Sequence, residues 1–196
     1  DVVGKSIVDL CAAPGGKTAF FASRGGRVIA VDRSESRLLR LHDNLERLRL
    51  AAEIIEGDVL IWRPQKRAEI VMLDAPCSAT GTARRHPDIL WTKTKIDVQK
   101  LARLQREMLR AAAEMVAKGG FLIFATCSLQ PEESCAHIEP FLTTHPNFKM
   151  IPVTIADVFG IDEVIAKSGF MRSLPHHFSK QGGMDGFFAV KFQRQI

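Results

Sequence analysis

Two cysteines are the side chains best suited to do chemistry in this chain, because each directly follows a predicted strand. Cys77 ends the sequence DAPC after the apolar run Ile70–Leu73, and Cys127 follows the run FLIFAT. A thiolate is a strong nucleophile that can form a covalent intermediate with its substrate. A lone cysteine is usually a small buried hydrophobic residue. Two at neighbouring strand ends, with Asp74 beside one of them, favour a reactive pair instead.

A glycine-rich turn, CAAPGGK, lies between the predicted strand Ser6–Leu10 and the predicted helix Lys17–Ser23. Glycines let the backbone approach a ligand closely, and the start of a helix favours an anionic group. A nucleotide-binding P-loop requires glycine where Cys11 stands, and the dinucleotide pattern GxGxxG is absent. The remaining interpretation is a methyltransferase turn that binds the carboxylate of S-adenosylmethionine. The residues assigned to this cofactor turn are Cys11, Ala12, Ala13, Pro14, Gly15, Gly16 and Lys17.

Three aspartates follow other predicted strands and complete the candidate cofactor site. Asp32 ends the second strand, where a carboxylate can accept hydrogen bonds from both ribose hydroxyls. Asp58 follows the third strand and is placed to meet the adenine amino group, and Asp74 follows the fourth. Each aspartate alone is equally well explained as a helix cap or a turn residue. Together with the cofactor turn, they indicate a nucleoside ligand.

Apolar runs alternate with helical stretches, which predicts a mostly parallel sheet with helices on both faces. Ligands bind at the carboxyl ends of the strands in such sheets, so the turn, the aspartates and both thiols are expected in one cleft. Residues Thr154–Gly183 are expected to form a long surface excursion. The expected strands are Ser6–Leu10, Arg27–Val31, Glu53–Glu56, Ile70–Leu73 and Phe121–Thr126, with Met150–Val153 and Phe187–Phe192 as edge strands and an antiparallel edge strand at the C-terminus; the expected helices are Lys17–Ser23, Ser34–Leu50, Thr94–Ala117 and Glu132–Thr143.

A reactive thiol beside a methyl donor has a particular use on a pyrimidine. Cytosine C5 is a poor nucleophile, and a thiolate that adds to C6 enables C5 to attack a methyl group. A base then removes the C5 proton, and the thiolate leaves. Asp74 is placed to hold the ring through N3 and N4, and the target base must be unstacked to be reached. Spacing alone does not rank Cys77 and Cys127, whereas Cys11 is interpreted as turn lining and Cys135 as helix packing.

Size and charge suit an enzyme that acts on a polyanion. The 196 residues fit one domain, and the net charge of +5 with a pI of about 9.2 fits RNA. No CxxC pair suggests zinc, no apolar run reaches membrane length, and the six histidines are expected on the surface or in loops. We expect a cytoplasmic monomer without a metal. A basic cluster that either contacts phosphates or forms a solvated helix face comprises Arg84, Arg85, Lys93, Lys95, Lys100, Arg103 and Arg106.

The chain resembles the Fmu/Sun/NSUN family of RNA cytosine-C5 methyltransferases in five motifs: LCAAPGGKT, AVDRSESRLLRLHDNLERL, LDAPCSATGTARRHPDILW, KGGFLIFATCSLQPEES and DGFF. The resemblance runs from Ser6 to Phe192 and is nearest the bacterial Sun-type enzymes that modify 16S ribosomal RNA. It implies a Rossmann-like class I methyltransferase fold, S-adenosylmethionine as cofactor and ribosomal RNA as substrate. It also implies that Cys127 is the nucleophile, that Cys77 assists release of the methylated RNA, and that Asp74 helps to position cofactor and base.

The family pattern is not followed at every position. Ala79 stands where glycine is usual, Phe124 where tyrosine is frequent, and Ser134 where asparagine is frequent. A methyl group at position 79 matters if the loop needs a positive φ there. Related Sun-type enzymes carry an upstream RNA-binding domain similar to an antitermination factor. We expect residues 1–196 to be the catalytic domain without that partner.

Three other functions remain open. A DNA cytosine methyltransferase would use Cys77 and dispense with Cys127. A ribosome-assembly scaffold would keep the fold and bind RNA without methylating it. The intact set of Cys77, Cys127, Asp74 and Lys17 argues against such a loss of activity. An NTPase would hydrolyse nucleotide in the presence of magnesium, and Cys11 disfavours that function.

Overall fold

The structure, a computed structural model, describes all 196 residues and consists of two compact units. The first unit comprises Asp1–Asp74, Met108–Leu122 and Arg194–Ile196, and the second comprises Ala75–Glu107 and Ile123–Gln193. None of the helices combines the length and the apolar character that a membrane span requires.

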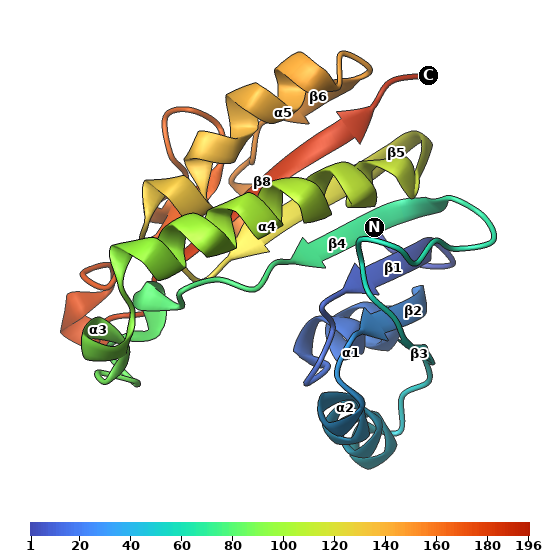
Figure 1. Cartoon of the computed structure of the whole chain (residues 1–196), viewed down its shortest axis with the longest axis horizontal. Coiled ribbons are helices and arrows are strands. Elements are labelled where there is room, and N and C mark those ends of the chain that lie inside the picture. The colour runs from blue at the N-terminus through green and yellow to red at the C-terminus, as the bar shows by residue number, and fades with distance from the viewer. The chain divides into compact units, whose positions relative to one another are not determined.

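Parallel strands form the frame of the first unit. β1 (Ser6–Leu10) pairs with β2 (Arg27–Asp32) and with β4 (Ala68–Asp74), and β2 pairs with β3 (Glu53–Glu56). The first part of β5 (Val116–Thr126) follows β4 in the sheet. Figure 1 shows the connecting helices in blue beside these strands: α1 (Gly16–Ser23) and α2 (Glu35–Leu48). The predicted alternation of strands and helices is confirmed here.

Helix α2 packs against the cofactor turn because of its leucine spacing. Leu38, Leu41 and Leu45 are buried, and their spacing places them on one face of the helix. They form a core cluster with Ala30 of β2 and with the alanines of the turn, Ala12 and Ala13. The helix ends at an αL residue, Arg49, which is a common way to stop a helix. Burial of these leucines therefore holds helix α2 against the turn.

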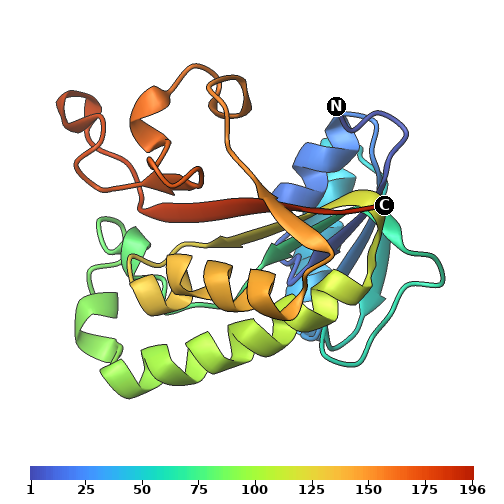
Figure 2. The same ribbon diagram turned by 90° about the horizontal axis from the view of Figure 1, so that it is seen from above.

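The second unit is built around β8 (Phe187–Arg194). This strand lies between the last part of β5 and β6 (Phe148–Ile151), and β7 (Met171–Ser173) pairs antiparallel with it. Phe124 of β5 and Phe188 of β8 are fully buried, with ring centroids 6.1 Å apart. Figure 2 shows helices α4 and α5 on one face of β8 and the orange-red segment before β8 on the other. The remaining helices of this region are α3 (Ile89–Thr92), α4 (Lys95–Glu114) and α5 (Ile138–Thr144).

The strands pair in the order β3-β2-β1-β4-β5-β8-β6, with β7 on β8. This is the expected Rossmann-like arrangement, parallel at the start of the chain and with antiparallel pairing near its C-terminus. Of the two late runs expected at the edge, β6 does end the order, whereas β8 lies inside it. The expected surface excursion contains β7 and three short 3₁₀ turns, and two of its valines, Val158 and Val164, are buried.

The predicted boundary between the long helix and the fifth strand is wrong. Helix α4 ends at Glu114, before the expected Ala117, and β5 begins at Val116. The glycines that suggested a helix stop belong to the strand. Gly119 has a φ of +77°, and a Cβ at Gly120 would lie 2.7 Å from the carbonyl oxygen of Glu69. These glycines allow a close strand approach, which sequence cannot distinguish from a helix end.

The expected single helix over Glu132–Thr143 is also wrong. Two 3₁₀ turns, Pro131–Glu133 and Cys135–His137, precede α5. They are separated by Ser134, whose φ of −139° and ψ of −108° are far from helical values. Cys135 therefore lies in a 3₁₀ turn and not on the expected helix. Glu133, the residue before this break, is fully buried.

Candidate functional site

The cofactor turn leaves β1 and enters α1 with an unusual backbone. Cys11 has a φ of 57°, the Ala13-Pro14 bond is cis, and Gly15 has a φ of 100°. A Cβ at Gly15 would lie 2.9 Å from Leu41 Cγ, whereas a Cβ at Gly16 would meet nothing within 4 Å. No side chain caps α1, and its first turn carries no acidic residue. Open space beside an uncapped helix start suits an anionic group.

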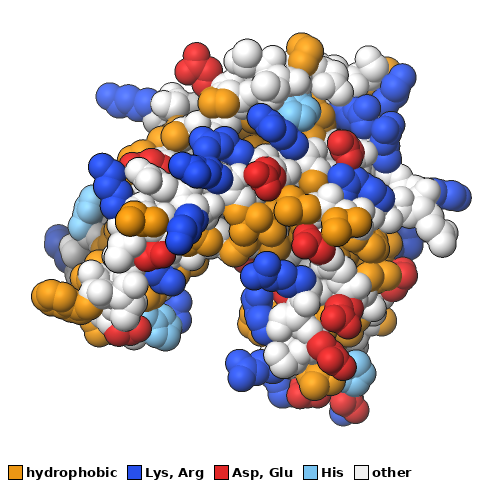
Figure 3. All heavy atoms as spheres, viewed as in Figure 1, with side chains coloured by type: hydrophobic (Ala, Val, Ile, Leu, Met, Phe, Trp, Pro, Cys, Tyr) orange, Lys and Arg blue, Asp and Glu red, His pale blue; other side chains and the backbone are white.

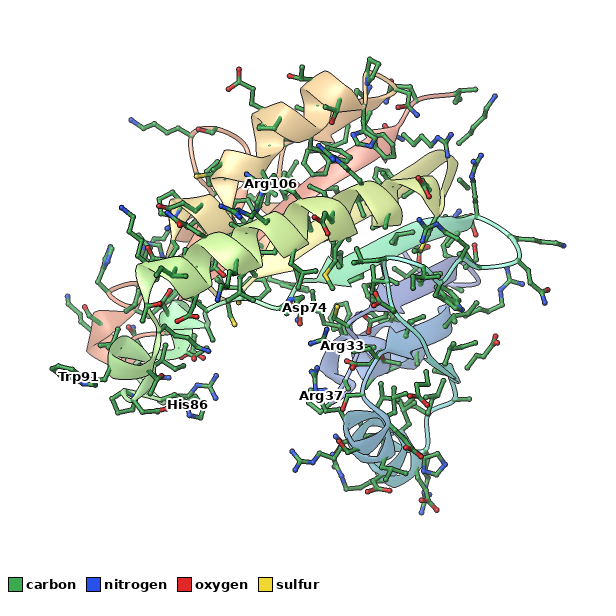
Figure 4. All side chains as sticks on the ribbon, viewed as in Figure 1. Arg33, Arg37, Asp74, His86, Trp91 and Arg106 are labelled. Atoms are coloured by element: carbon green, nitrogen blue, oxygen red, sulfur yellow. The ribbon has the colours of Figure 1, made fainter.

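Asp32 fastens this turn to the end of β2. Its carboxylate is 2% exposed, and its oxygens accept hydrogen bonds from the N–H groups of Ala13 and Ser34, both at 3.1 Å. Arg37 lies 3.3 Å from Asp32 Oδ2 and also donates to the carbonyl of Ala13. Figure 4 shows Arg37 with its neighbour Arg33 at this end of the strand. The shape of the turn thus depends on a side chain of the next strand.

The other two aspartates have different surroundings. Asp74 forms an ion pair of 2.7 Å with Lys17 of the turn, and both side chains are about one-third exposed. Asp58 Oδ1 accepts a hydrogen bond from Leu60 N–H at 2.9 Å, as a turn residue does. The first unit therefore brings the turn together with Asp32 and Asp74, while the observed contact of Asp58 lies within its own turn.

A buried aspartate inside β1 escaped the sequence interpretation. Asp9 is fully buried, its Oδ2 accepts a hydrogen bond of 2.6 Å from Thr18 Oγ1, and its Oδ1 has no partner. Burial raises the pKa of this carboxyl to about 6, although the Thr18 hydrogen bond and the Lys17 charge oppose the rise. The available signal was an acidic residue inside an otherwise apolar strand, SIVDL.

The thiol of Cys11 is poorly suited to act as a nucleophile. Burial raises its pKa to about 12, and the carboxylates of Asp32 and Asp74 contribute to the rise. The thiol therefore stays protonated at neutral pH. This agrees with the interpretation of Cys11 as lining of the turn.

The second unit places the other two candidate thiols side by side. Cys77 Sγ and Cys127 Sγ are 3.4 Å apart, and both residues are partly exposed. The hydrogen bond to Cys127 is the main cause that raises the pKa of Cys77, followed by burial. A shared proton between two close thiols means that one stays protonated when the other ionises. The raised pKa of Cys77 keeps this thiol protonated at neutral pH.

The loop after Cys77 has little conformational freedom. Gly81 donates from its N–H to the carbonyl of Cys127 at 2.9 Å, and its own carbonyl accepts from Gly186 N–H at 2.8 Å. A Cβ at Gly81 would lie 2.1 Å from the Gly186 oxygen, so no side chain fits there. Ala79 has a φ of 59° and a ψ of 20°. The loop therefore does use the left-handed conformation that glycine adopts more readily at this position.

The family follows from the sequence comparison. The family model described as 16S rRNA methyltransferase RsmB/F matches residues 2–193. The chain belongs to this family. The ribosomal RNA small subunit methyltransferase B of Serratia proteamaculans is 44% identical over 193 residues, which are 96% of this chain and 42% of that protein. Its counterpart in Sodalis glossinidius is 47% identical over 148 residues, or 73% of this chain and 34% of that one.

A solved structure agrees with this assignment. The crystal structure of NSun6 from Pyrococcus horikoshii with SFG superposes with a TM-score of 0.81 at 28% identity, covering 97% of this chain and 48% of that one. The chain spans about two-fifths of the length of the curated relatives it matches. The family membership thus concerns a region of those proteins.

Buried polar residues behind the thiols form a second feature that the sequence interpretation missed. They include His137, which was expected on the surface but is 2% exposed. Burial, aided by the charge of Arg106, lowers the pKa of His137 to about 4. The histidine is therefore neutral at physiological pH. The other buried members are Ser78, Thr80, Gln105, Ser128, Glu133 and Ser134.

The basic cluster divides into two parts. Arg84 and Arg85 lie near the carboxylate of Asp185, which neutralises part of their charge; Arg85 Nε donates to Asp185 Oδ2 at 2.8 Å. The other five are exposed: Lys93 directly follows α3, and α4 carries Lys95, Lys100, Arg103 and Arg106. Figure 3 shows Lys and Arg side chains along α4. Figure 4 shows His86 and Trp91 on the segment that carries α3, where Trp91 is 89% exposed.

No cluster of three or more His, Cys, Asp and Glu side chains is arranged to hold a metal ion.

Proposed function

We propose that residues 1–196 form the catalytic domain of a methyltransferase that methylates C5 of cytosine in RNA, with S-adenosylmethionine as methyl donor. The observation that carries the proposal is the 3.4 Å separation of Cys77 Sγ and Cys127 Sγ, each following a strand. Relatives named as ribosomal RNA small subunit methyltransferases support ribosomal RNA as the substrate. Methylation of ribosomal RNA by this protein is proposed to occur in the cytoplasm.

The first unit fits the proposed cofactor. S-adenosylmethionine supplies an electrophilic methyl group on a sulfonium. The uncapped start of α1 and the open space beside Gly16 suit its carboxylate. Asp32 keeps the turn in shape and is assigned to the ribose, Asp58 to the adenine amino group, and Lys17 with Asp74 to the reactive end. Their carboxylates and backbone donors are the kinds of group that a nucleoside requires.

Cys127 is assigned as the nucleophile. The hydrogen bond to Cys127 and burial raise the pKa of Cys77, which makes Cys77 a poor nucleophile, and the Arg85 guanidinium lies close enough to Cys127 to interact with it electrostatically. The Cys127 thiolate forms a bond to cytosine C6, and C5 then takes the methyl group. Loss of the C5 proton to a base lets the C6–S bond break, which restores the thiolate. Cys77, beside this sulfur, is assigned to the release of the methylated RNA, and Asp74 to the ring N3 and N4.

RNA is the proposed partner because of charge and exposed side chains. The chain has a net charge of +5, and Lys93, Lys95 and Lys100 are exposed near α3 and α4. Basic side chains bind phosphates without regard to sequence, and an exposed aromatic ring such as Trp91 can stack on an unpaired base. We propose that the chain acts as a monomer and that an upstream RNA-binding domain adds affinity for the target.

The decisive experiment transfers labelled methyl groups from S-adenosylmethionine to unmodified ribosomal RNA and, separately, to DNA, followed by nucleoside analysis. We expect the label in 5-methylcytidine from RNA. Label in DNA would support the DNA methyltransferase instead. RNA binding and cofactor binding without any label would support a scaffold.

A further inference from the structure

Glu133 is a fully buried glutamate behind the two thiols. Glutamate is almost never fully buried unless its charge is paired or hydrogen-bonded. Removing a carboxylate from water is unfavourable, and well-packed apolar residues often replace buried charged groups without loss of stability. A buried carboxylate next to a candidate active site therefore requires an explanation other than stability.

The carboxylate of Glu133 binds the residue that follows each thiol. Oε1 accepts a hydrogen bond from Ser78 N–H at 2.8 Å, and Oε2 accepts from Ser128 Oγ at 2.6 Å. The hydroxyl of Ser78 also donates to Oε2. Ser78 directly follows Cys77, and Ser128 directly follows Cys127. One carboxylate therefore links the two loops, which lie 50 residues apart in the chain.

Gln105 of α4 supports Glu133 from behind. Its Nε2 donates to Glu133 Oε1 at 3.2 Å and to the carbonyl of Pro76 at 2.8 Å. Because both partners are acceptors, the side-chain amide has only one possible orientation. Its Oε1 then faces His137 Nε2 at 3.0 Å, so the neutral histidine donates this hydrogen bond. A residue just before Cys77 is thus held by the same network.

The backbone of Glu133 is fixed to the other loop. Its carbonyl accepts a hydrogen bond of 3.1 Å from Thr126 Oγ1, and Thr126 directly precedes Cys127. The next residue, Ser134, departs from helical geometry. The residues before and after each cysteine are therefore held in place. Their contacts lead to Glu133, either directly or through Gln105.

We propose that Glu133 is a positioning residue that holds Cys77 Sγ beside Cys127 Sγ by binding the serine after each cysteine. Its catalytic consequence rests on the proposed function, but the thiol geometry does not. Without the carboxylate, the two loops lose their shared acceptor, and the thiols lose their fixed separation. A reaction or a ligand that needs both thiols at once would then pay an additional ordering cost.

The test compares Glu133→Gln with Glu132→Gln, an exposed neighbour that serves as the matched control. The probe is phenylarsine oxide, whose trivalent arsenic condenses with two adjacent thiols and releases water. A Cys77→Ala protein defines the affinity that a single thiol provides. We expect Glu133→Gln to bind the arsenical at least about tenfold more weakly than wild type, while Glu132→Gln and the wild type agree within about twofold.

Two further measurements distinguish positioning from general damage. The affinity for S-adenosylmethionine should stay within about twofold of wild type in Glu133→Gln, and kcat for RNA should fall while KM changes little. Unchanged arsenical affinity in Glu133→Gln would overturn the proposal. If that variant does not fold, Ser78→Ala and Ser128→Ala each remove one donor, and wild-type arsenical affinity in both would overturn it equally. A wild type that binds the arsenical but methylates no RNA would refute the proposed function alone.

Discussion

Each unit of this protein buries one carboxylate completely, and the two carboxylates differ in how many hydrogen-bond donors surround them. In the first unit, Asp9 receives one hydrogen bond, from Thr18, and its Oδ1 has no partner. In the second unit, Glu133 receives donors at both oxygens, from Ser78, Ser128 and Gln105. Burial raises the pKa of Asp9 to about 6, as expected for a buried carboxylate whose hydrogen bonds come only from Thr18.

The difference reflects what each unit has to hold in place. The cofactor turn of the first unit is shaped mainly by its backbone, with Asp32 as its external support. The thiol loops of the second unit are shaped by side-chain hydrogen bonds that come from three separate segments. A site built from backbone groups tolerates most side-chain changes, whereas a site built from side chains depends on their identity.

The largest effect is expected at the thiols. Cys127→Ala should lower methyl transfer by at least about a thousandfold, because no other side chain replaces the nucleophile. Affinity for S-adenosylmethionine, measured by calorimetry, should stay within about twofold, since the residues proposed to bind the cofactor lie in the first unit.

Cys77→Ala tests the role of the second thiol. It should leave a covalent protein–RNA adduct that survives denaturing electrophoresis, because the release step fails. Full turnover by Cys127→Ala would reverse the assignment of the two thiols and favour a Cys77 nucleophile.

The next largest effect concerns the poorly satisfied carboxylate of Asp9. Its folded-state pKa of about 6 lies above the ordinary value of 3.8, so the folded chain binds a proton that the unfolded chain releases between these values. Stability should therefore fall by about 3 kcal/mol as pH rises from about 4 to 7, with no further loss above. Asp9→Asn should remove this loss, as chemical denaturation at several pH values would show.

The exposed Asp43 supplies the control for this experiment. Asp43→Asn should keep the wild-type dependence of stability on pH. If Asp9→Asn keeps it as well, the contrast between the two buried carboxylates does not hold.

Loss of Asp32 should weaken cofactor binding by a factor of about 10 to 100. Asp32→Ala removes a charged acceptor from Ala13 and Ser34, and such hydrogen bonds are worth about 1.5–3 kcal/mol. Glu56→Ala changes the exposed residue that stands opposite Asp32 in the sheet, and it should bind S-adenosylmethionine normally. Equal affinity in both variants would mean that the turn keeps its shape without help from β2.

The smallest effect is expected at Ala79. Its φ of 59° is unfavourable for a residue with a Cβ, so Ala79→Gly should stabilise the protein by about 1 kcal/mol and raise its Tm by about 2–4 °C. Ala22→Gly, within α1, should instead destabilise by about 1 kcal/mol. A fall in Tm for Ala79→Gly would show that the flexibility of glycine in the unfolded chain outweighs the relief of strain.

Local patterns in the sequence were sufficient to predict the frame of this protein. Alternation of apolar runs with helical spacing predicted β1 to β4 and the two helices between them, because burial of one face requires that periodicity. The same alternation predicted the glycine turn after β1, the positions of Asp32 and Asp74 at the ends of β2 and β4, and those of Cys77 and Cys127 after β4 and β5.

Only the tertiary structure revealed what holds the thiols. Glu133, Gln105 and His137 contact one another across 28 and 32 residues of chain, and nothing in their local spacing indicates a shared network. Glycines at 119 and 120 and the break at Ser134 misled the sequence interpretation for the same reason. Their meaning depends on which strand or side chain comes close in space. Periodicity is a property of neighbours along the chain, whereas the satisfaction of buried polar groups is decided by partners that only folding brings together.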